Sequence, residues 1–460
     1  MTDMTRENRY FDVRPRIVPA DRQATIEIRS LFDHCRLDDT VEYEVTYYPV
    51  EEIALKSGWK EKQARLVKPA GGVLRVGQYF EAEQEHVILV DRVNGERRQR
   101  VGDFRVYSVA ADLFGRRPFK GDFHIHSSRS DGKESPAYVA GACRRIGLDF
   151  MAVTDHKKYA PSLEAQRAFQ GVEIDLRIFP GEEVHPPDNP VHIVNYGGRF
   201  SVNDLFADEA AYREAVEKVA AKVGKLPEGV DRYPYASAVW CFDRIREGGG
   251  LGIFCHPYWF TEHRYSPAGA LTSYLFETQP FDAYEVIGGY TYDEFDSNTL
   301  QAARYHEERV RGRRLPIVGA TDSHGCENKE RGLFGWYCTI VFAPSLAFED
   351  VTRSVKDLYS VAVEAVPGDR ARPVGPLRLV KYALFLLREV FPPHDELCVE
   401  EGRLMLAHAA ELEAAASGAP ADACPLARGG PAGEKSAAAA LARLRGQTAA
   451  LMDRCWAPRV

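Results

Sequence analysis

Short apolar runs alternate with segments of helical periodicity between residues 119 and 365, and this alternation constrains the fold more than any other feature of the sequence. Residues 148–153 and 250–255 are two of the apolar runs, and residues 300–311 form a helical stretch between two others. This order is typical of βα units, in which a helix follows each strand and covers the sheet. The sequence therefore predicts an α/β fold for this region.

The regions on either side have different patterns. Residues 1–115 contain period-two runs such as 41–47 and no convincing helix, which favours a small β-sandwich. After residue 372 strand signals end, and the sequence is typical of helices. A chain of 460 residues also exceeds the size at which one hydrophobic core usually stops growing. We therefore predict three domains: a β-sandwich at 1–115, a barrel of βα units at 116–372 and a helical extension at 373–460.

Composition narrows the functional classes. The formal net charge is −8, whereas a protein that binds duplex nucleic acid presents a broad basic face. The sequence contains no run of about 20 apolar residues and no apolar core of the signal-peptide type. Its nine cysteines are scattered and form no CxxC pair. We expect a cytoplasmic protein that acts on a small molecule, with neither duplex nucleic acid nor a membrane as a partner; the sequence predicts no oligomeric state.

Histidine and aspartate residues follow several of the apolar runs. Period-two geometry places Asp122, His124 and His126 on one face of a strand. In barrels of βα units the carboxyl ends of the strands meet at one mouth, so side chains far apart in sequence gather there. Three later runs end in similar pairs: Asp155 and His156, Cys255 and His256, and Asp322 and His324.

Five motifs in this order resemble the PHP (polymerase and histidinol phosphatase) family. They are DFHIHSSRSDG at 122–132, GLDFMAVTDH at 147–156, FPGEEVH at 179–185 followed by VHIVNY at 191–196, CHP at 255–257, and GATDSH at 319–324. A single HxH pair is weak evidence, whereas an ordered series of five motifs is strong evidence. The resemblance covers about half of the chain and implies a distorted (β/α)7 barrel.

The resemblance also implies two or three divalent metal ions, with Glu183 as the bridging carboxylate. The neighbouring Glu182 has the same chemistry, and only its position disfavours it. His185 lies on the same strand face as Glu183 and is either an additional ligand or a histidine outside the metal shell. Imidazole and carboxylate ligands without thiolate favour zinc, manganese or iron. The implied ligands are His124, His126, Asp131, His156, Glu183, His192, His256, Asp322 and His324.

Two further aspartates, Asp122 and Asp155, adjoin the implied ligands. Each of them either orients an imidazole or caps a turn.

The activity implied by the resemblance is that of a metal-dependent hydrolase, and specifically a phosphoesterase of EC class 3.1. In this hypothesis a metal-activated hydroxide attacks the phosphorus of a phosphomonoester or phosphodiester. Asp322 takes part in catalysis, and His156, His256 or a water molecule protonates the leaving group. Three cationic side chains in loops beside the motifs are candidates for binding the substrate: Arg129, Lys157 and Arg264.

Two other functions remain open. The chain is similar to a carbaryl-hydrolase-like branch of the family in pairing an N-terminal β-domain with the motif domain, which implies hydrolysis of a carbamate, ester or amide at the same site. Alternatively, the metals are structural and the flanking domains bind a partner. Structural zinc sites are normally closed by four protein ligands, so the excess of ligands here favours a catalytic site.

Overall fold

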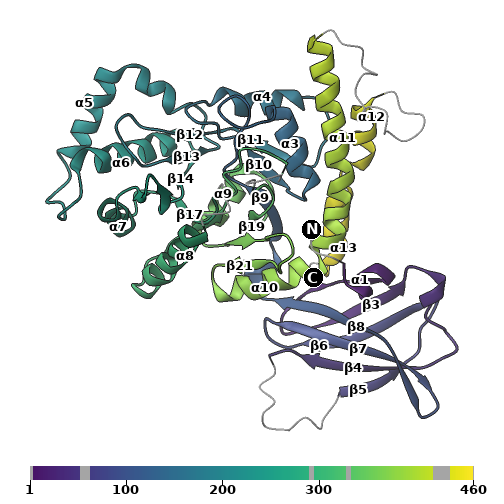
Figure 1. Ribbon diagram of the computed structural model, residues 1–460. Coiled ribbons are helices and arrows are strands. Elements are labelled where there is room, and N and C mark those ends of the chain that lie inside the picture. The colour runs from purple at the N-terminus through teal and green to yellow at the C-terminus, as the bar shows by residue number, and fades with distance from the viewer. Residues whose placement is uncertain (1–3, 52–62, 290–294, 328–332, 418–435, 459–460) are drawn as a thin grey trace. The chain divides into compact units, whose positions relative to one another are not determined.

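The computed structural model describes residues 4–51, 63–289, 295–327, 333–417 and 436–458. The chain divides into two units (Figure 1). Unit 1 comprises Met1–Arg117, Leu377–Leu397 and Gly446–Val460, and unit 2 comprises Pro118–Pro376 and Cys398–Arg445.

Two sheets make up most of unit 1. A three-stranded sheet has the order β1-β3-β6 and a five-stranded sheet has the order β2-β8-β7-β4-β5. Side chains from both sheets, such as Ile28 and Ile88, share one buried core. The finer prediction of a sandwich is not confirmed. The strands are β1 Phe11–Arg14, β2 Ile17–Pro19, β3 Arg22–Ser30, β4 Tyr43–Pro49, β5 Gln63–Val67, β6 Val73–Phe80, β7 Glu85–Asn94 and β8 Arg97–Val109, with short helices α1 Arg6–Tyr10 and α2 Ala111–Phe114.

Unit 2 has a mixed α/β architecture, as the sequence predicts, but its strands form two main sheets. One has the order β11-β10-β9-β19-β20-β21 and the other has the order β12-β13-β14-β17-β18. The exact (β/α)7 barrel is not confirmed. The strands are β9 Arg117–Asp122, β10 Phe150–Ala152, β11 Arg177–Phe179, β12 Gly181–Val184, β13 Ile193–Tyr196, β14 Leu251–Phe254, β17 Ala283–Ile287, β18 Ile317–Gly319, β19 Tyr337–Ala343, β20 Ser360–Glu364 and β21 Arg372–Val374, and a small hairpin is formed by β15 Trp259–Thr261 and β16 Arg264–Ser266.

The departure from a regular barrel has a local cause between β11 and β13. Pro180 separates β11 from β12, and a proline has no N–H to continue a ladder. The connection from β12 to β13 is too short for a crossover helix, so these two strands pair antiparallel. By contrast, β10 pairs parallel with both β9 and β11, and β17 pairs parallel with both β14 and β18.

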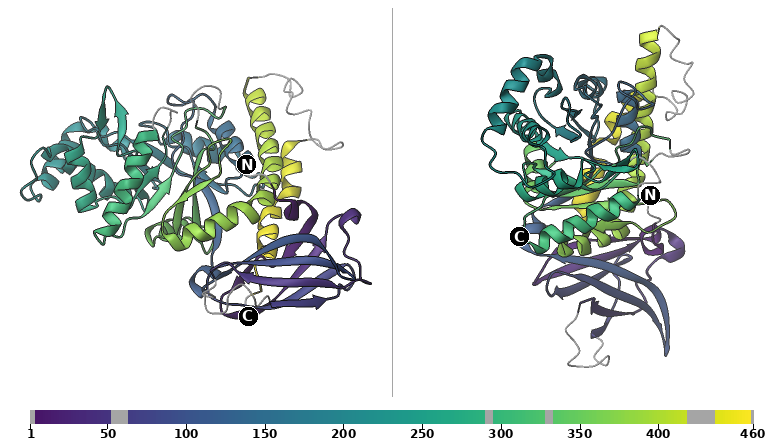
Figure 2. Two further views of the ribbon diagram at one scale, coloured as in Figure 1. Left: turned by 60° about the horizontal axis from the view of Figure 1, so that its bottom comes forward. Right: turned by 60° about the vertical axis from the view of Figure 1, so that its left-hand side comes forward.

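Helices cover the sheets of unit 2 (Figures 1 and 2). The first of them begins after Ser135, whose hydroxyl accepts a hydrogen bond from the Tyr138 N–H, and has proline at its first position. None of the helices within the described residues combines the length and apolar composition needed to cross a membrane. The helices are α3 Pro136–Arg145, α4 Ala160–Ala168, α5 Glu209–Ala220, α6 Arg232–Glu247, α7 Gly269–Thr278, α8 Phe295–Val310 and α9 Phe348–Lys356.

The C-terminal helices do not form a unit of their own, in contrast to the predicted extension at 373–460. Helices α10 Leu377–Glu389 and α13 Gln447–Cys455 belong to unit 1, and α12 Ala437–Leu444 belongs to unit 2. The long α11 Phe391–Ser417 begins in unit 1 and ends in unit 2. In unit 2 the reason is burial of apolar side chains, because Leu404 and Met405 of α11 and Leu441 of α12 pack with Val139 of α3 in one core.

Candidate metal centre

The structure brings the nine predicted ligands together in unit 2, near the ends of strands. His124 and His126 follow β9, His156 follows β10 and His256 follows β14. Isolated bridges join Ile125 of the first motif to Ser323 of the last, and His156 of the second to Glu183 of the third. The Thr154 N–H donates to the Ile125 carbonyl and so joins the first motif to the second. Donor atoms of His126, Asp131, His156 and His324 lie within 4.8 Å of one another, and so do those of His124, His126 and Asp322.

The paired histidines and Asp322 form the tightest set of donors. The Nε2 atoms of His124 and His126 are 3.1 Å apart, and Oδ1 of Asp322 lies 3.2 Å from the first and 2.8 Å from the second. Ligands bound at about 2.0–2.2 Å to one ion lie about 3 Å from one another. All three side chains are buried, so this set fits a divalent metal ion.

Glu183 lies at the centre of the candidate site and is fully buried. Its Oε1 is 3.0 Å from His192 Nδ1 and 3.5 Å from His256 Nε2, and its Oε2 contacts His156 Nδ1 and lies 3.6 Å from His124 Nε2. Neither oxygen accepts a well-aligned hydrogen bond from the described residues. Burying an ionised carboxylate without donors is costly, and divalent cations between it and the imidazoles would remove that cost.

The neighbouring Glu182 points to the opposite side of β12, because successive side chains of a strand alternate. Its carboxylate accepts hydrogen bonds from Asn195, Ser201 and Asn203 and from the backbone N–H of Val202. The geometry therefore separates two glutamates that the sequence leaves chemically equivalent, and it places Glu183 among the imidazoles.

Glu285 is a further residue of the candidate site that the sequence analysis missed. It lies on β17, is 1% exposed, and its Oε1 is 2.7 Å from His124 Nδ1. Its other oxygen accepts a hydrogen bond of 2.8 Å from the His256 N–H. Glu285 thus orients His124 with Nε2 toward the other donors. The available signal was a single carboxylate inside the apolar run 283–287.

The residues whose roles the sequence left open have distinct surroundings. Asp122 accepts hydrogen bonds from the Thr321 hydroxyl and from the N–H groups of Thr321 and His124. Asp155 accepts from the N–H and hydroxyl of Ser127. Both aspartates therefore hold the backbone of the motifs.

Two histidines at the edge of the site differ in how they are held. The Nε2 of His185 is 2.9 Å from His156 Nδ1 and 3.1 Å from Glu183 Oε2, which adds its imidazole to the cluster. His324 donates from Nδ1 to the Asp322 carbonyl at 2.8 Å, so its Nε2 carries the lone pair on the side of Asp131.

The pKa values of the site residues are shifted in both directions by burial and by neighbouring charges. Burial lowers the pKa of His126 and of His192 to about 4, which keeps these imidazoles neutral. Burial disfavours ionisation of Glu183, yet the surrounding imidazoles of His124, His192 and His156 together outweigh it and hold the pKa of Glu183 well below its usual range. Burial likewise opposes protonation of His124, but Asp322 and Glu285 raise its pKa well above the usual value. A metal ion would take the place of that proton.

Two of the predicted ligands have a left-handed backbone: φ is 27° at His256 and 51° at Asp322. Non-glycine residues rarely adopt positive φ, and strain of this kind persists where surrounding contacts enforce it, often at functional sites. At His256 the enforcing contact is the hydrogen bond from its N–H to Glu285.

The three predicted substrate-binding cations are placed differently. Arg129 makes two hydrogen bonds to Glu164, and Arg264 is 74% exposed in its side chain and pairs with Glu262 at 3.7 Å. Lys157 lines a hollow together with His185. Lys157 thus shares a hollow with a histidine of the candidate site.

Comparisons with known proteins give partial matches. No family model matches the chain. The DNA polymerase/3'-5' exonuclease PolX of Bacillus subtilis is 39% identical over 84 residues, which are 17% of this chain and 15% of that protein. The chain therefore matches a small part of that relative's length.

Among solved structures, a two-domain protein from Bacteroides vulgatus containing a predicted PHP-like metal-dependent phosphoesterase has a TM-score of 0.37 and 17% identity, over 54% of this chain and 65% of that chain. A protein from Bifidobacterium adolescentis described as a metal-dependent phosphoesterase has a TM-score of 0.31 and 19% identity, over 46% of this chain and 90% of that chain. An amidohydrolase from Chromobacterium violaceum with bound sulfate has a TM-score of 0.28 and 20% identity, over 46% and 89%. The chain resembles the PHP type of metal-dependent phosphoesterase, and the carbaryl-hydrolase-like branch is not confirmed.

Proposed function

We propose that the chain is a metal-dependent hydrolase, and specifically a phosphoesterase that acts on a small phosphate ester. The observation that carries the proposal is the surroundings of Glu183. Six imidazoles have a nitrogen within 3.7 Å of its buried oxygens, those of His124, His126, His156, His185, His192 and His256. A structural metal site is normally closed by four protein ligands, so a donor set of this size favours an open, multinuclear centre.

The residues would hold two or three zinc, manganese or iron ions in overlapping sets. His124, His126 and Asp322 form one set, and His126 with Asp131, His156 and His324 forms another. Glu183 would join them, with His192 and His256 on the side of its Oε1. Bound ions of this kind activate water and stabilise the anionic oxygens of a phosphate ester.

The protein's own side chains orient this chemistry and supply its proton. Glu285 fixes the ring of His124 so that its Nε2 faces His126, and the Asp322 carbonyl fixes the ring of His324 so that its Nε2 faces His156. His156, His256 or a water molecule would protonate the leaving group, and a histidine would do so only through a nitrogen that holds no metal ion. The side chain of His156 is 26% exposed and that of His256 is 10% exposed, so His156 is more accessible to a substrate.

Turnover of paired chromogenic esters tests the proposal. Protein loaded separately with manganese, zinc or iron would be assayed on p-nitrophenyl phosphate, bis(p-nitrophenyl) phosphate, p-nitrophenyl acetate and a p-nitrophenyl carbamate, with Asp322→Ala as the blank. We expect metal-dependent turnover of a phosphate ester that is lost in the variant. Turnover of only the acetate or carbamate would replace the phosphoesterase with a carbon-centre hydrolase. No turnover of any substrate with metal bound would favour a noncatalytic role.

A further inference from the structure

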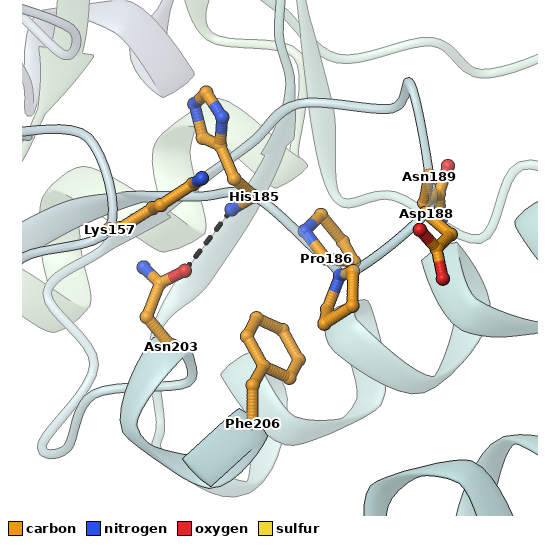
Figure 3. Close-up of a pocket in the computed structure, with 8 residues that line it drawn as sticks. Lys157, His185, Pro186, Asp188, Asn189, Asn203 and Phe206 are labelled. Atoms are coloured by element: carbon orange, nitrogen blue, oxygen red, sulfur yellow. Dashed lines mark hydrogen bonds between the residues drawn. The ribbon is translucent and has the colours of Figure 1, made fainter. Parts of the chain in front are cut away.

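A hollow adjoins the candidate metal centre on the side of His185. Its volume is about 590 Å³, within the range of pockets that hold small molecules. Figure 3 shows Lys157 and His185 next to each other on its wall, with Phe206 beside Pro186. Because the His185 ring lies 2.9 Å from His156 and 3.1 Å from Glu183, a molecule in the hollow would lie beside the predicted metal ligands.

Most polar groups of the hollow are already engaged. Asn203 accepts from the His185 N–H and donates to Glu182 and to the Glu183 carbonyl. The side-chain amide of Asn189 donates to the Pro234 carbonyl and the Ser237 hydroxyl. Asp188 forms an ion pair with Arg213.

Lys157 differs from these residues, because its ammonium group has no ion pair or hydrogen bond within the described part of the chain. Its backbone is nevertheless held firmly. The Lys157 N–H donates to the Glu183 carbonyl at 3.0 Å, and its φ is 57°. By contrast, the ammonium of the next residue, Lys158, donates to the Arg129 carbonyl. The hollow therefore presents the positive charge of an exposed lysine whose backbone is held directly after His156.

We propose that this hollow is the substrate subsite of the metal centre and that Lys157 is its specificity-determining residue. This proposal rests on the phosphoesterase activity proposed above. Lys157 binds an anionic oxygen of the substrate phosphate, and the apolar surfaces of Pro186, Pro187 and Phe206 hold its organic group. Esters of carboxylic and carbamic acids have no such charge. The subsite therefore selects phosphate esters over neutral esters that the same metal centre could hydrolyse.

The test compares Lys157→Met with Lys158→Met, which removes a neighbouring cation that does not line the hollow. Each metal-loaded variant is assayed on p-nitrophenyl phosphate and p-nitrophenyl acetate, and inorganic phosphate binding is measured by calorimetry. Metal content is determined for each variant. For Lys157→Met we expect the KM for the phosphate ester to rise about tenfold and the affinity for inorganic phosphate to fall about tenfold, because one charge-assisted hydrogen bond is lost. The kinetics on the acetate ester and the metal content should not change. Lys158→Met should match the wild type, and Lys157→Arg should retain most of the phosphate selectivity.

The inference is overturned if Lys157→Met binds phosphate like the wild type, if it loses both substrates in the same proportion, or if the wild type binds no phosphate. A wild type that hydrolyses no ester but binds phosphate through Lys157 would refute the proposed activity and leave the subsite standing. The two proposals therefore fail in distinguishable ways.

Discussion

At the scale of single residues, Glu182 and Glu183 show how one position along a strand decides a role. Glu182 accepts hydrogen bonds from four donors, whereas the oxygens of Glu183 accept no well-aligned hydrogen bond from the described residues. We expect Glu183→Gln to lower the bound metal, measured by elemental analysis, because the substitution removes the carboxylate charge that lies among the imidazoles of the candidate site.

The matched variant is Glu182→Gln. It removes one of the two carboxylate oxygens that accept the four hydrogen bonds of Glu182. The free energy of unfolding, measured with urea, should therefore fall by about 1–3 kcal/mol while the protein still binds metal. If both variants lost the same amount of metal and were equally stable, Glu183 would not be a metal ligand in distinction from a structural Glu182.

At the scale of elements, strands β4, β7 and β8 of unit 1 are joined by a buried histidine. His86 of β7 contacts the Tyr47 hydroxyl through Nδ1 and the Ser108 hydroxyl through Nε2, each at 2.7 Å. Burial lowers the pKa of His86 from 6.5 to about 4. Between these pH values His86 binds a proton in the unfolded chain but not in the folded chain. Its contribution to the free energy of unfolding is therefore fully present above about pH 6.5 and is lost as the pH is lowered toward 4, by about 3 kcal/mol at most.

Hydrogen exchange of the β7 and β8 amides, corrected for the intrinsic effect of pH, measures this loss. His86→Gln should flatten the pH dependence between pH 6.5 and 4.5, and substitution of the exposed His34 by Gln should leave it unchanged. A wild-type slope retained in His86→Gln would assign the effect to other groups.

At the scale of the whole molecule, the C-terminal helices are integral to the two units. In unit 2, Arg144 of α3 is fully buried and bonds to Glu401 of α11 at 2.7 Å and to Asp149 at 3.0 Å. Removing a buried cation leaves its partners as uncompensated charges, so Arg144→Met should lower the free energy of unfolding by about 3–5 kcal/mol.

Urea unfolding of the full chain checks this value against Arg403→Met. Arg403 pairs with Glu400 on the same helix at 2.8 Å, and its side chain is 40% exposed. An exposed pair contributes about 0–1 kcal/mol, so the second variant should remain close to the wild type. Similar losses in both would mean that α11 is not anchored through Arg144.

The sequence by itself determined the local features of this protein. Alternating apolar runs and helical patterns predicted the α/β class, and the residues that follow the apolar runs predicted histidine and aspartate donors at strand ends. These features depend on the neighbours of each residue along the chain, which the sequence records directly.

Only the tertiary structure decided the features that depend on contacts between distant segments. It divided the C-terminal helices between two units, placed Glu285 behind His124, and gave Lys157 rather than Arg129 or Arg264 a place in the hollow. The orientation of a side chain in an apolar strand, or the partner of a surface cation, is set by which other segment packs against it. The residue type alone leaves that choice open, because the same carboxylate or ammonium group is equally suited to several partners.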